Sequence, residues 1–563
     1  MDDEKKYAET FIRTCTALFN LSDRDKGSWV DVVKKVIPEL IPASELQDDV
    51  KSNMGRVCSH ARVDILNLAT AHMSYIFPEG QRWFRFEPWQ KDDDYDITDE
   101  DSWFAQCTDV ATRELGRSNF QTEMNNVCVD RCVTGTGLML IEMDPKDDVL
   151  VFTHIPAGTY AIAQDAQHNV NTVVRKFNYT PAQMVEAFGL DNLPDAIKTQ
   201  FDREGERYSA QHEVWHLVAP SNDFFPEKPQ EILDANPFVS VYLEPSSRTI
   251  LDFGTVFEFP YMCTRFIRYG NSAYGQSPLS NVKDVIDDLM VQEDVMKMIA
   301  QRSAVPSVII PADLEGEVDL RAGGQTIIPL QYLNSQVPRE WAPPTNYQVG
   351  IDQIERLKAE IDAATHVNML QVISNTDRYM TATEVSERSA ERVHTFYPSF
   401  AQCQVDARSM WNRVFSLLMR AGKFSMEDMP QWVIQVIQFE DGYTERILSP
   451  KVAYTGRMQQ MMERVISSNT DAYIAKQLQI ASATQDPTAI SVIDWMDYSL
   501  GEAYAAGVPS RYLRKPNEVK QELSRLQQMQ QQQAAMRQAA EAAAANRDNA
   551  AAENYRAQYG QSQ

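Results

Sequence analysis

Residues His212–His216 read HEVWH and match the HExxH pattern of zinc proteases. In those enzymes the pattern lies on a helix, where histidines four residues apart share one face and bind one ion while the glutamate acts as a base. Here the pattern runs into Leu-Val-Ala and stops at Pro220, a context that favours a strand. On a strand the two histidines would lie roughly 13 Å apart, which is too far for one zinc ion. We therefore expect a structural role for both histidines and keep a zinc-dependent hydrolase as the weaker alternative.

The other patterns that could carry chemistry are incomplete. Gly135-Thr136-Gly137 lacks the third glycine of a dinucleotide-binding loop, and the chain contains no GxxxxGK[ST] phosphate loop. Cys128 and Cys132 share a helical face without a flanking histidine, so we interpret them as small core residues. No set of serine, histidine and aspartate can be assembled from the sequence. We predict that the protein is not an enzyme and uses no catalytic residue, cofactor or metal.

The chain is strongly acidic. Its 563 residues include 79 aspartates and glutamates against 53 lysines and arginines, which gives a net charge of −26. Such a surface repels polyphosphates and argues against a protein that wraps DNA, although a duplex could still pass without binding. The seven cysteines are odd in number and form no CxxC pair, which favours reduced, buried thiols in a cytosolic product. The start, MDDEKKYAET, is unlike a signal peptide and no apolar run reaches 18 residues, so we predict no membrane association.

The clearest structural feature is a pair of long acidic helices. The first is expected to begin at Ser280 or Asn281 and to end at Ala304, about 24 residues or roughly 36 Å. Its apolar side chains recur at helical spacing, at Val282, Val285, Ile286, Leu289, Met296 and Ile299. Acidic side chains occupy its other faces, at Asp284, Asp287, Asp288, Glu293 and Asp294. A second helix is expected at 351–372, beyond a segment rich in Pro, Gly and β-branched residues, and the pair suits a stave in a ring of identical chains.

The rest of the chain predicts an α+β protein that is predominantly helical. Before residue 270 the patterns indicate the following helices and strands: helices at 53–76, 103–132 and 181–188, and strands at 150–154, 171–178, 212–218, 239–243 and 256–268. Towards the C-terminus they indicate a strand at 432–439, a helical bundle at 448–505 and a Gln- and Ala-rich helix from Pro516 to about Tyr559.

A polar loop is expected at 374–380, after the second long helix. Thr381 and Glu384 follow it with the spacing of a capping box, in which each side chain binds a free backbone N–H at the start of a helix. That helix should bend at Pro398, because proline removes one backbone hydrogen bond, and should end at Gly422.

Several of these blocks occur in an order that resembles the portal, or head-to-tail connector, proteins of short-tailed double-stranded DNA bacteriophages (podophages). The blocks that carry the resemblance are Phe77-Pro78 with Trp83-Phe84, Val133–Gly137 before a strand that ends at Glu142, Arg265 with Tyr274–Pro278, Arg378 with Thr381–Val385, and Gly507-Val508-Pro509 before a Gln-rich helix with Glu518. The resemblance covers nearly the whole chain.

The resemblance implies the portal fold, in which wing, stem, clip and crown or barrel regions assemble as a ring of twelve around an axial channel. Its regions map onto this chain in order: wing at 1–270, first stem helix at 271–304, clip at 305–349, second stem helix at 350–373, tunnel loop at 374–380, kinked wing helix and strand at 381–447, crown at 448–515, and C-terminal barrel helix with an Ala- and Gln-rich tail at 516–563.

The implied function is a channel at one capsid vertex through which the genome is packaged and ejected, in a protein that is assembled in the host cytoplasm. Expected partners are copies of the chain itself, double-stranded DNA in transit, the major capsid protein, the terminase large subunit, a tail adaptor, and scaffolding or internal core proteins. A capsid scaffolding or adaptor protein that uses the Gln- and Ala-rich tail is a third alternative.

The channel interpretation gives two sets of candidate site residues. In the tunnel loop we expect Asn375, Arg378 and Tyr379 to touch DNA transiently, with an ion pair to a neighbouring subunit as the equal alternative for Arg378. In the stem we expect Asp284, Asp287 and Asp288 to face the lumen. A conduit should carry few phosphate-binding cations, because each contact with a phosphate strengthens binding, and acidic stem helices suit that requirement.

Overall fold

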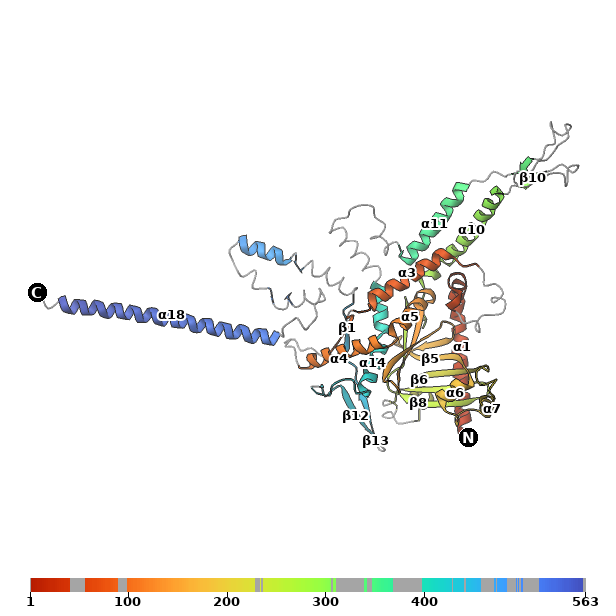
Figure 1. Ribbon diagram of the computed structural model, residues 1–563, viewed down its shortest axis with the longest axis horizontal. Helices are drawn as coiled ribbons and strands as arrows, with labels where there is room; N and C mark the ends of the chain where they lie inside the picture. The colour runs from red at the N-terminus through yellow and green to blue at the C-terminus, as the bar shows by residue number, and fades with distance from the viewer. Residues whose placement is uncertain are drawn as a thin grey trace. The chain divides into compact units, whose positions relative to one another are not determined.

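The structure is a computed structural model (Figure 1). It describes residues 2–40, 56–80, 82–89, 99–227, 233, 236–304, 307–309, 339–341, 347–367, 397–427, 429–439, 442–456, 470–471, 473–483, single positions between 493 and 499, and 516–559. The chain divides into two compact units, which we describe separately. The first unit comprises Met1–Trp83, Val110–Lys423 and Gln431–Ser449, and the second comprises Phe84–Asp109, Phe424–Pro430 and Pro450–Gln563. Among the described helices, none is long and apolar enough to cross a membrane.

The first unit contains a five-stranded antiparallel sheet whose strands follow one another in chain order. They are β4 (Tyr160–Gln164), β5 (Val170–Tyr179), β6 (His212–Pro220), β7 (Phe238–Glu244) and β8 (Thr249–Val256). One face is covered by α1 (Asp2–Val36), whose Phe11 and Cys15 pack on Leu217. The opposite face carries Val214, which packs against α6 (Pro181–Phe188) and α7 (Asp195–Asp202). This alternation of buried residues is what period-two side-chain placement on a strand requires.

A second, three-stranded sheet has the order β3 (Val149–Ile155), β2 (Thr136–Asp144) and β9 (Tyr261–Arg265). Helix α5 (Phe120–Thr134) packs on β2 and β3, and α3 (Ser59–Ile76) packs on α5. Helix α14 (Arg408–Arg420) contacts β2 and β9. These elements form the body that supports the two long helices.

Two sequence predictions for the part of the chain before residue 270 are wrong. The helix expected at 103–132 is two helices, α4 (Asp99–Arg117) and α5. The break falls at Ser118 and Asn119. The Ser118 hydroxyl donates to Leu115 O (2.7 Å) and accepts from Phe120 N–H (3.2 Å), so it competes with the helix backbone. The Asn119 side chain donates to the Phe152 carbonyl (2.7 Å) and accepts from the Phe152 N–H (2.9 Å), which fixes the break to β3. The strand expected at 256–268 is also divided, because β8 ends at Val256 and Pro260 precedes β9. Strand β4 was not predicted.

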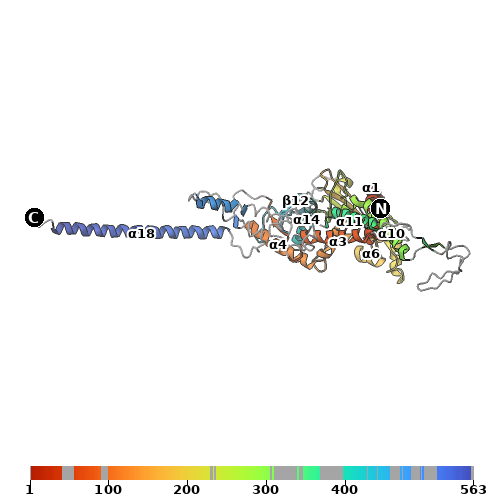
Figure 2. The same ribbon diagram turned by 90° about the horizontal axis from the view of Figure 1, so that it is seen from above.

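The two long helices are present and pack side by side as a hairpin (Figure 1). The first is α10 (Lys283–Ala304), which begins two to three residues later than predicted because a 3-10 turn, η2 (Pro278–Val282), precedes it. The second is α11 (Tyr347–Thr365), which begins earlier than expected and ends before Val372 at His366, where φ is +56°. We call η2, α10 and α11 the long hairpin. In Figures 1 and 2 its α11 lies alongside α3, with which it is in contact.

Beyond the outer ends of α10 and α11, β10 (Ser307–Ile309) and β11 (Arg339–Trp341) pair antiparallel. Both strands belong to the inserted segment that follows α10 and precedes α11 in the sequence. Strands β12 (Ile434–Phe439) and β13 (Gly442–Ile447) form a further hairpin in the first unit. The strand expected at 432–439 is thereby confirmed.

The helix expected to reach Gly422 ends as predicted. Gly422 has φ +64°, Lys423 N–H donates to Leu418 O and Gly422 N–H to Met419 O, which is the hydrogen-bond pattern of a Schellman cap. Within the described part of this helix, residues 397–420, the interruption lies at Ala407. The predicted bend at Pro398 is adjacent to residues outside the described ranges, and the capping box at Thr381 lies outside them altogether.

The second unit pairs β1 (Phe84–Glu87) with β14 (Lys451–Tyr454). The helical bundle expected from residue 448 therefore does not begin there. Helix α18 (Pro516–Tyr559) is one uninterrupted helix of 44 residues, as the Gln- and Ala-rich sequence predicted (Figures 1 and 2). All seven cysteines of the chain are free and buried, which agrees with the prediction of reduced core thiols.

Candidate functional site

The base of the long hairpin is fixed by two glycine-containing segments, Gly135–Gly137 and Tyr274–Pro278, which we call the hairpin root. Gly135 ends α5 with φ +91°, and its backbone packs directly on that of Gly275. A Cβ built on either glycine would lie less than 3.0 Å from backbone atoms of the other. Only glycine permits this approach, because the neighbouring atoms belong to the main chain and cannot move aside.

Hydrogen bonds complete the hairpin root. Gly275 N–H donates to the Thr136 hydroxyl (2.9 Å), and the Ser277 hydroxyl donates to Cys132 O (2.6 Å). Ser277 also accepts from Leu279 N–H (3.1 Å), so the same side chain caps η2 and ties it to α5. The start of the long hairpin is therefore held by the end of α5.

A buried ion pair lies next to the hairpin root. The Arg265 guanidinium donates to Asp406 Oδ1 (2.8 Å), and Arg265 N–H donates to Asp406 Oδ2 (2.7 Å). Both side chains are almost inaccessible to solvent. Burial lowers the pKa of Arg265, but the hydrogen bond to Asp406 and its charge outweigh burial and raise that pKa above its ordinary value. Arg265 is therefore charged at neutral pH, and its contacts with Asp406 join β9 to the helical segment 397–406.

Arg131 is fully buried in α5 and connects this helix to three further elements. It donates to Arg265 O (3.1 Å), to the Ser399 hydroxyl (3.0 Å) and to His72 Nδ1 (2.7 Å). Burial, together with the positive charge of Arg131, lowers the pKa of His72 far below its ordinary value. His72 is thus a neutral acceptor, and the group is a structural junction between α3, α5, the end of β9 and the segment that contains Ser399.

Ion pairs also attach α10 to the body. Lys283 Nζ lies 2.8 Å from Asp31, and Lys35 Nζ lies 2.5 Å from Asp287. The hydrogen bond from Lys283 lowers the pKa of Asp31. Further along α10, Met290 O accepts a hydrogen bond from Arg56 (3.0 Å). Arg56 also forms ion pairs with Glu293 and Asp294 of the same helix. These contacts hold the inner half of α10.

The face of α10 that points away from α11 is exposed. It carries Val291, Val295 and Met298, of which 62%, 36% and 51% of the residue surface is accessible. Their spacing of four and three residues places them on one side of the helix, and Asp284 and Asp288 extend the same side towards the hairpin root. Both aspartates are exposed, whereas Asp287 is half-buried against Lys35. This face is acidic near the body and apolar in its outer half.

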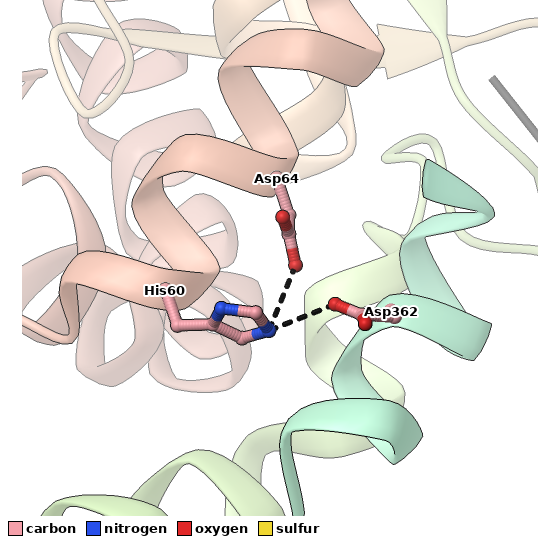
Figure 3. Close-up of side chains that lie close together, drawn as sticks. All are labelled: His60, Asp64 and Asp362. Carbon is pink, nitrogen blue, oxygen red and sulfur yellow. Dashed lines mark hydrogen bonds and ion pairs between the residues drawn. The ribbon is translucent and has the colours of Figure 1, made fainter. Parts of the chain in front are cut away.

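Three polar side chains meet where α3 contacts α11 (Figure 3). His60 Nε2 lies 2.8 Å from Asp362 Oδ1 and 3.4 Å from Asp64 Oδ2. His60 and Asp64 are one turn apart on α3, and Asp362 is on α11.

Comparison with known proteins identifies the type of protein to which this architecture belongs. A family model described as "Bacteriophage head to tail connecting protein" matches residues 14–513. The chain belongs to the bacteriophage head-to-tail connecting protein family. It is 26% identical over 388 residues to the "Probable portal protein" of Bordetella phage BPP-1, covering 66% of this chain and 67% of that protein. It is 23% identical over 473 residues to the "Portal protein" of Salmonella phage epsilon15, covering 80% and 83%.

Membership of this family decides between the functions that the sequence left open. The chain is a phage portal protein, a structural component of the virion at the capsid vertex, and it is not an enzyme. The expected portal family and α+β fold are confirmed, and the alternatives of a zinc hydrolase and a capsid scaffolding or adaptor protein are wrong.

The structure of the HEVWH segment agrees with this result. Residues 212–216 lie on strand β6, as predicted. His216 is buried between the Tyr261 hydroxyl (2.6 Å) and the Ser240 hydroxyl (3.0 Å), and it stacks on Tyr242. Burial, with the nearby charge of Arg175, lowers the pKa of His216 far below its ordinary value. His216 is therefore a neutral core residue of the connector.

The structure describes some of the predicted site residues of the connector and not others. Asn375, Arg378 and Tyr379 lie outside the described residues. Asp284 and Asp288 are exposed on α10, and Asp287 is engaged by Lys35. Sequence reasoning missed the group of His60, Asp64 and Asp362. The spacing of His60 and Asp64 on a predicted helix was a usable signal, but no sequence pattern pointed to Asp362.

Proposed function

We propose that twelve copies of this connector form a ring in which the long hairpins stand side by side around a channel for double-stranded DNA. The observation that carries the proposal is the exposed apolar strip of α10, formed by Val291, Val295 and Met298. Isolated apolar residues are common on surfaces, but a strip along a projecting helix is costly to leave in water. The long hairpin of the adjacent subunit is the surface best placed to cover this apolar strip, because identical subunits in a closed ring repeat one heterologous contact.

Asp284 and Asp288 would line the inner part of the channel. They share a side of α10 with the apolar strip, so one helix face would meet the lumen near the body and a neighbour further out. A straight face can do both only if the hairpins are inclined to the ring axis. The acidic lumen would keep DNA mobile, because phosphates are repelled and no counterions are released by binding. Asp287, which is engaged by Lys35, would contribute less.

The segment after α11 would complete the channel. In the sequence, residues 374–380 come after α11, which ends at Thr365, and before the described helical residues 397–420. We assign Asn375, Arg378 and Tyr379 to a tunnel loop that touches passing DNA. The remaining regions follow the resemblance: wing at 1–270 and 381–447, clip at 305–349, crown at 448–515 and barrel helix at 516–563.

The partners that this role requires are the major capsid protein around the wing, the terminase large subunit and then a tail adaptor at the clip, and scaffolding or internal core proteins during assembly. The order of sequence blocks supports a short-tailed phage. Packaging would use the terminase as the motor, and the connector would serve as conduit and platform.

A pair of substitutions on α10 tests the ring contact. Val295→Asp places a charge in the apolar strip and should prevent or strongly weaken ring formation, because the charge would lose its water on assembly. Gln301→Asp adds the same charge to an exposed position on another side of α10 and should leave assembly unchanged. Mass measurement by light scattering and negative-stain micrographs read out both. Normal hollow rings from Val295→Asp would contradict the proposed contact, and an unassembled wild-type chain would contradict the ring itself.

A further inference from the structure

The group of His60, Asp64 and Asp362 joins the body to the second helix of the long hairpin (Figure 3). The potential ligand atoms of the three side chains all lie within 4.8 Å of one another. Over the described residues, no other three histidine, cysteine or acidic side chains come together in this way. His60 and Asp64 come from α3 and Asp362 from α11, so the group bridges two elements that are far apart in the sequence.

The charges in this group do not balance. A protonated His60 carries one positive charge against two carboxylates. Asp64 is only 4% exposed, and its Oδ2 accepts no hydrogen bond, because the closer partner of His60 Nε2 is Asp362. The only charged contact of this oxygen among the described residues is His60 Nε2 at 3.4 Å. A buried carboxylate oxygen that accepts no hydrogen bond is costly, which points to a further partner at this position.

We propose that His60, Asp64 and Asp362 bind a divalent transition-metal ion, of the class of Zn²⁺ or Mn²⁺, which fastens α11 to α3. Metal–ligand bonds of roughly 2.0–2.2 Å place neighbouring ligand atoms about 3–3.5 Å apart, close to the separations of 2.8 and 3.4 Å that involve His60 Nε2. An ion at this point would neutralise both carboxylates and bond directly to Asp64 Oδ2, which accepts no hydrogen bond.

The types of ligand atom and their exposure to solvent indicate which class of ion the site would bind. Imidazole with carboxylates suits Zn²⁺ or Mn²⁺, whereas Mg²⁺ and Ca²⁺ prefer oxygen ligands alone. His60 and Asp64 have the i, i+4 spacing that allows two side chains on one helix to reach one ion. The side chains of His60 and Asp362 are 28% and 24% exposed, which leaves a path for the ion and room for a water ligand.

The site would rigidify the inner end of the long hairpin. Arg56, just before α3, already holds α10 through Glu293 and Met290. A metal at His60 would add the matching attachment for α11, so that both helices of the hairpin are fixed to the same part of the body. All three ligands belong to one chain, so binding does not depend on the proposed ring and can be tested separately from it.

The test uses the full-length protein after removal of metals with EDTA. Titration calorimetry with ZnCl₂ and with MnCl₂ should show one site per chain, and Co²⁺ should give a visible absorption band as a spectroscopic probe. The variants Asp362→Asn and His60→Gln should weaken binding by at least about tenfold. Asp352→Asn removes an exposed carboxylate from the same helix and should bind metal as the wild type does.

A third variant separates metal binding from folding. Asp64→Asn removes the like-charge contact with Asp362, so without metal this variant should melt at the same temperature as the wild type or higher. It should also lose the rise in melting temperature that Zn²⁺ gives the wild type. The proposal is overturned if the wild type binds no stoichiometric metal, or if Asp64→Asn and Asp362→Asn bind with unchanged affinity, which would place the ion elsewhere.

Discussion

Gly135 and Gly275 pack main chain against main chain, so that neither residue has room for a Cβ. One ends α5 and the other precedes η2, and each belongs to a sequence block through which the chain resembles portal proteins. The contact explains why both blocks contain glycine. It also places the origin of the long hairpin on the body with little freedom, because Thr136 and Ser277 add hydrogen bonds on either side.

Replacing either glycine should be severely destabilising. Gly275→Ala and Gly135→Ala would each force backbone atoms apart, and Gly135 would also carry a side chain at φ +91°, so we expect a loss of about 3 kcal/mol or more in the free energy of unfolding. Thermal and denaturant unfolding measure the loss. Gly116→Ala, in the last turn of α4 with open space around it, should be neutral or stabilise by up to about 1 kcal/mol. Equal effects at all three positions would refute the packing argument.

The ion pair between Arg265 and Asp406 gives a second prediction. Asp406→Ala leaves the Arg265 guanidinium charged and buried, and removing one partner of a buried pair costs about 3–5 kcal/mol. The matched control is Glu206→Ala, which breaks the exposed pair with Arg203 and should cost no more than about 1 kcal/mol. Unfolding curves of the two variants should differ accordingly. If Asp406→Ala proved as mild as Glu206→Ala, the pair could not be the attachment of the 397–406 segment.

The stability of the protein should depend on pH through His154 and Asp130. Burial lowers the pKa of His154, but the hydrogen bond to Asp130, at 2.7 Å, and the charge of that carboxylate outweigh burial and raise that pKa above 6.5. The folded state therefore holds this proton more tightly than the unfolded state. The contribution is complete below pH 6.5 and is lost as the pH rises through the raised value. Burial also raises the pKa of Asp130, so this carboxyl group too binds its proton more tightly in the folded state than in the unfolded state.

The measurement for this pair is the melting midpoint between about pH 6 and pH 9, which should fall as the pH rises. His154→Gln keeps a hydrogen-bonding side chain but cannot titrate, so its midpoint should vary less over the same interval. A wild-type midpoint that rises with pH, or a variant with an unchanged slope, would count against the assignment.

The sequence predicted the helices, strands and helix ends that depend on residues close together in the chain. The apolar spacing of α10 and α11 predicted both helices, Gly422 predicted a helix end, and the β-branched surroundings of His216 predicted strand β6. Each signal lies within a few residues of the feature that it specifies. The portal resemblance added an order of blocks that no single block could supply.

The features that were missed depend on contacts between distant residues. The end of α5 and the start of η2 pack together through Gly135 and Gly275. The sequence around either glycine does not indicate that the other one contacts it. The break between α4 and α5 is fixed by hydrogen bonds from Asn119 to the distant Phe152 backbone. The site at His60 needs Asp362 from another helix. Reading one stretch at a time cannot reveal such pairs, because the information lies in the tertiary packing.

The last prediction concerns the charge of the proposed channel. Replacing Asp284 and Asp288 with lysine exchanges two exposed negative charges for two positive ones on the same side of α10. If this side lines the lumen, assembled rings should retain a short DNA duplex that wild-type rings release. The logarithm of the binding constant should then fall more steeply with the logarithm of salt concentration, by about 0.9 for each phosphate that the new lysines neutralise.

The control for the channel prediction is the double variant Asp352→Lys and Glu355→Lys, which makes the same change on exposed positions of α11. Filter binding or fluorescence anisotropy over a series of salt concentrations compares the two. Retention by the α10 variant alone supports α10 as the helix that lines the channel. Retention by the α11 variant alone would mean that α11 faces the DNA and that Asp284 and Asp288 lie between subunits, because lysines hidden between subunits cannot reach a phosphate.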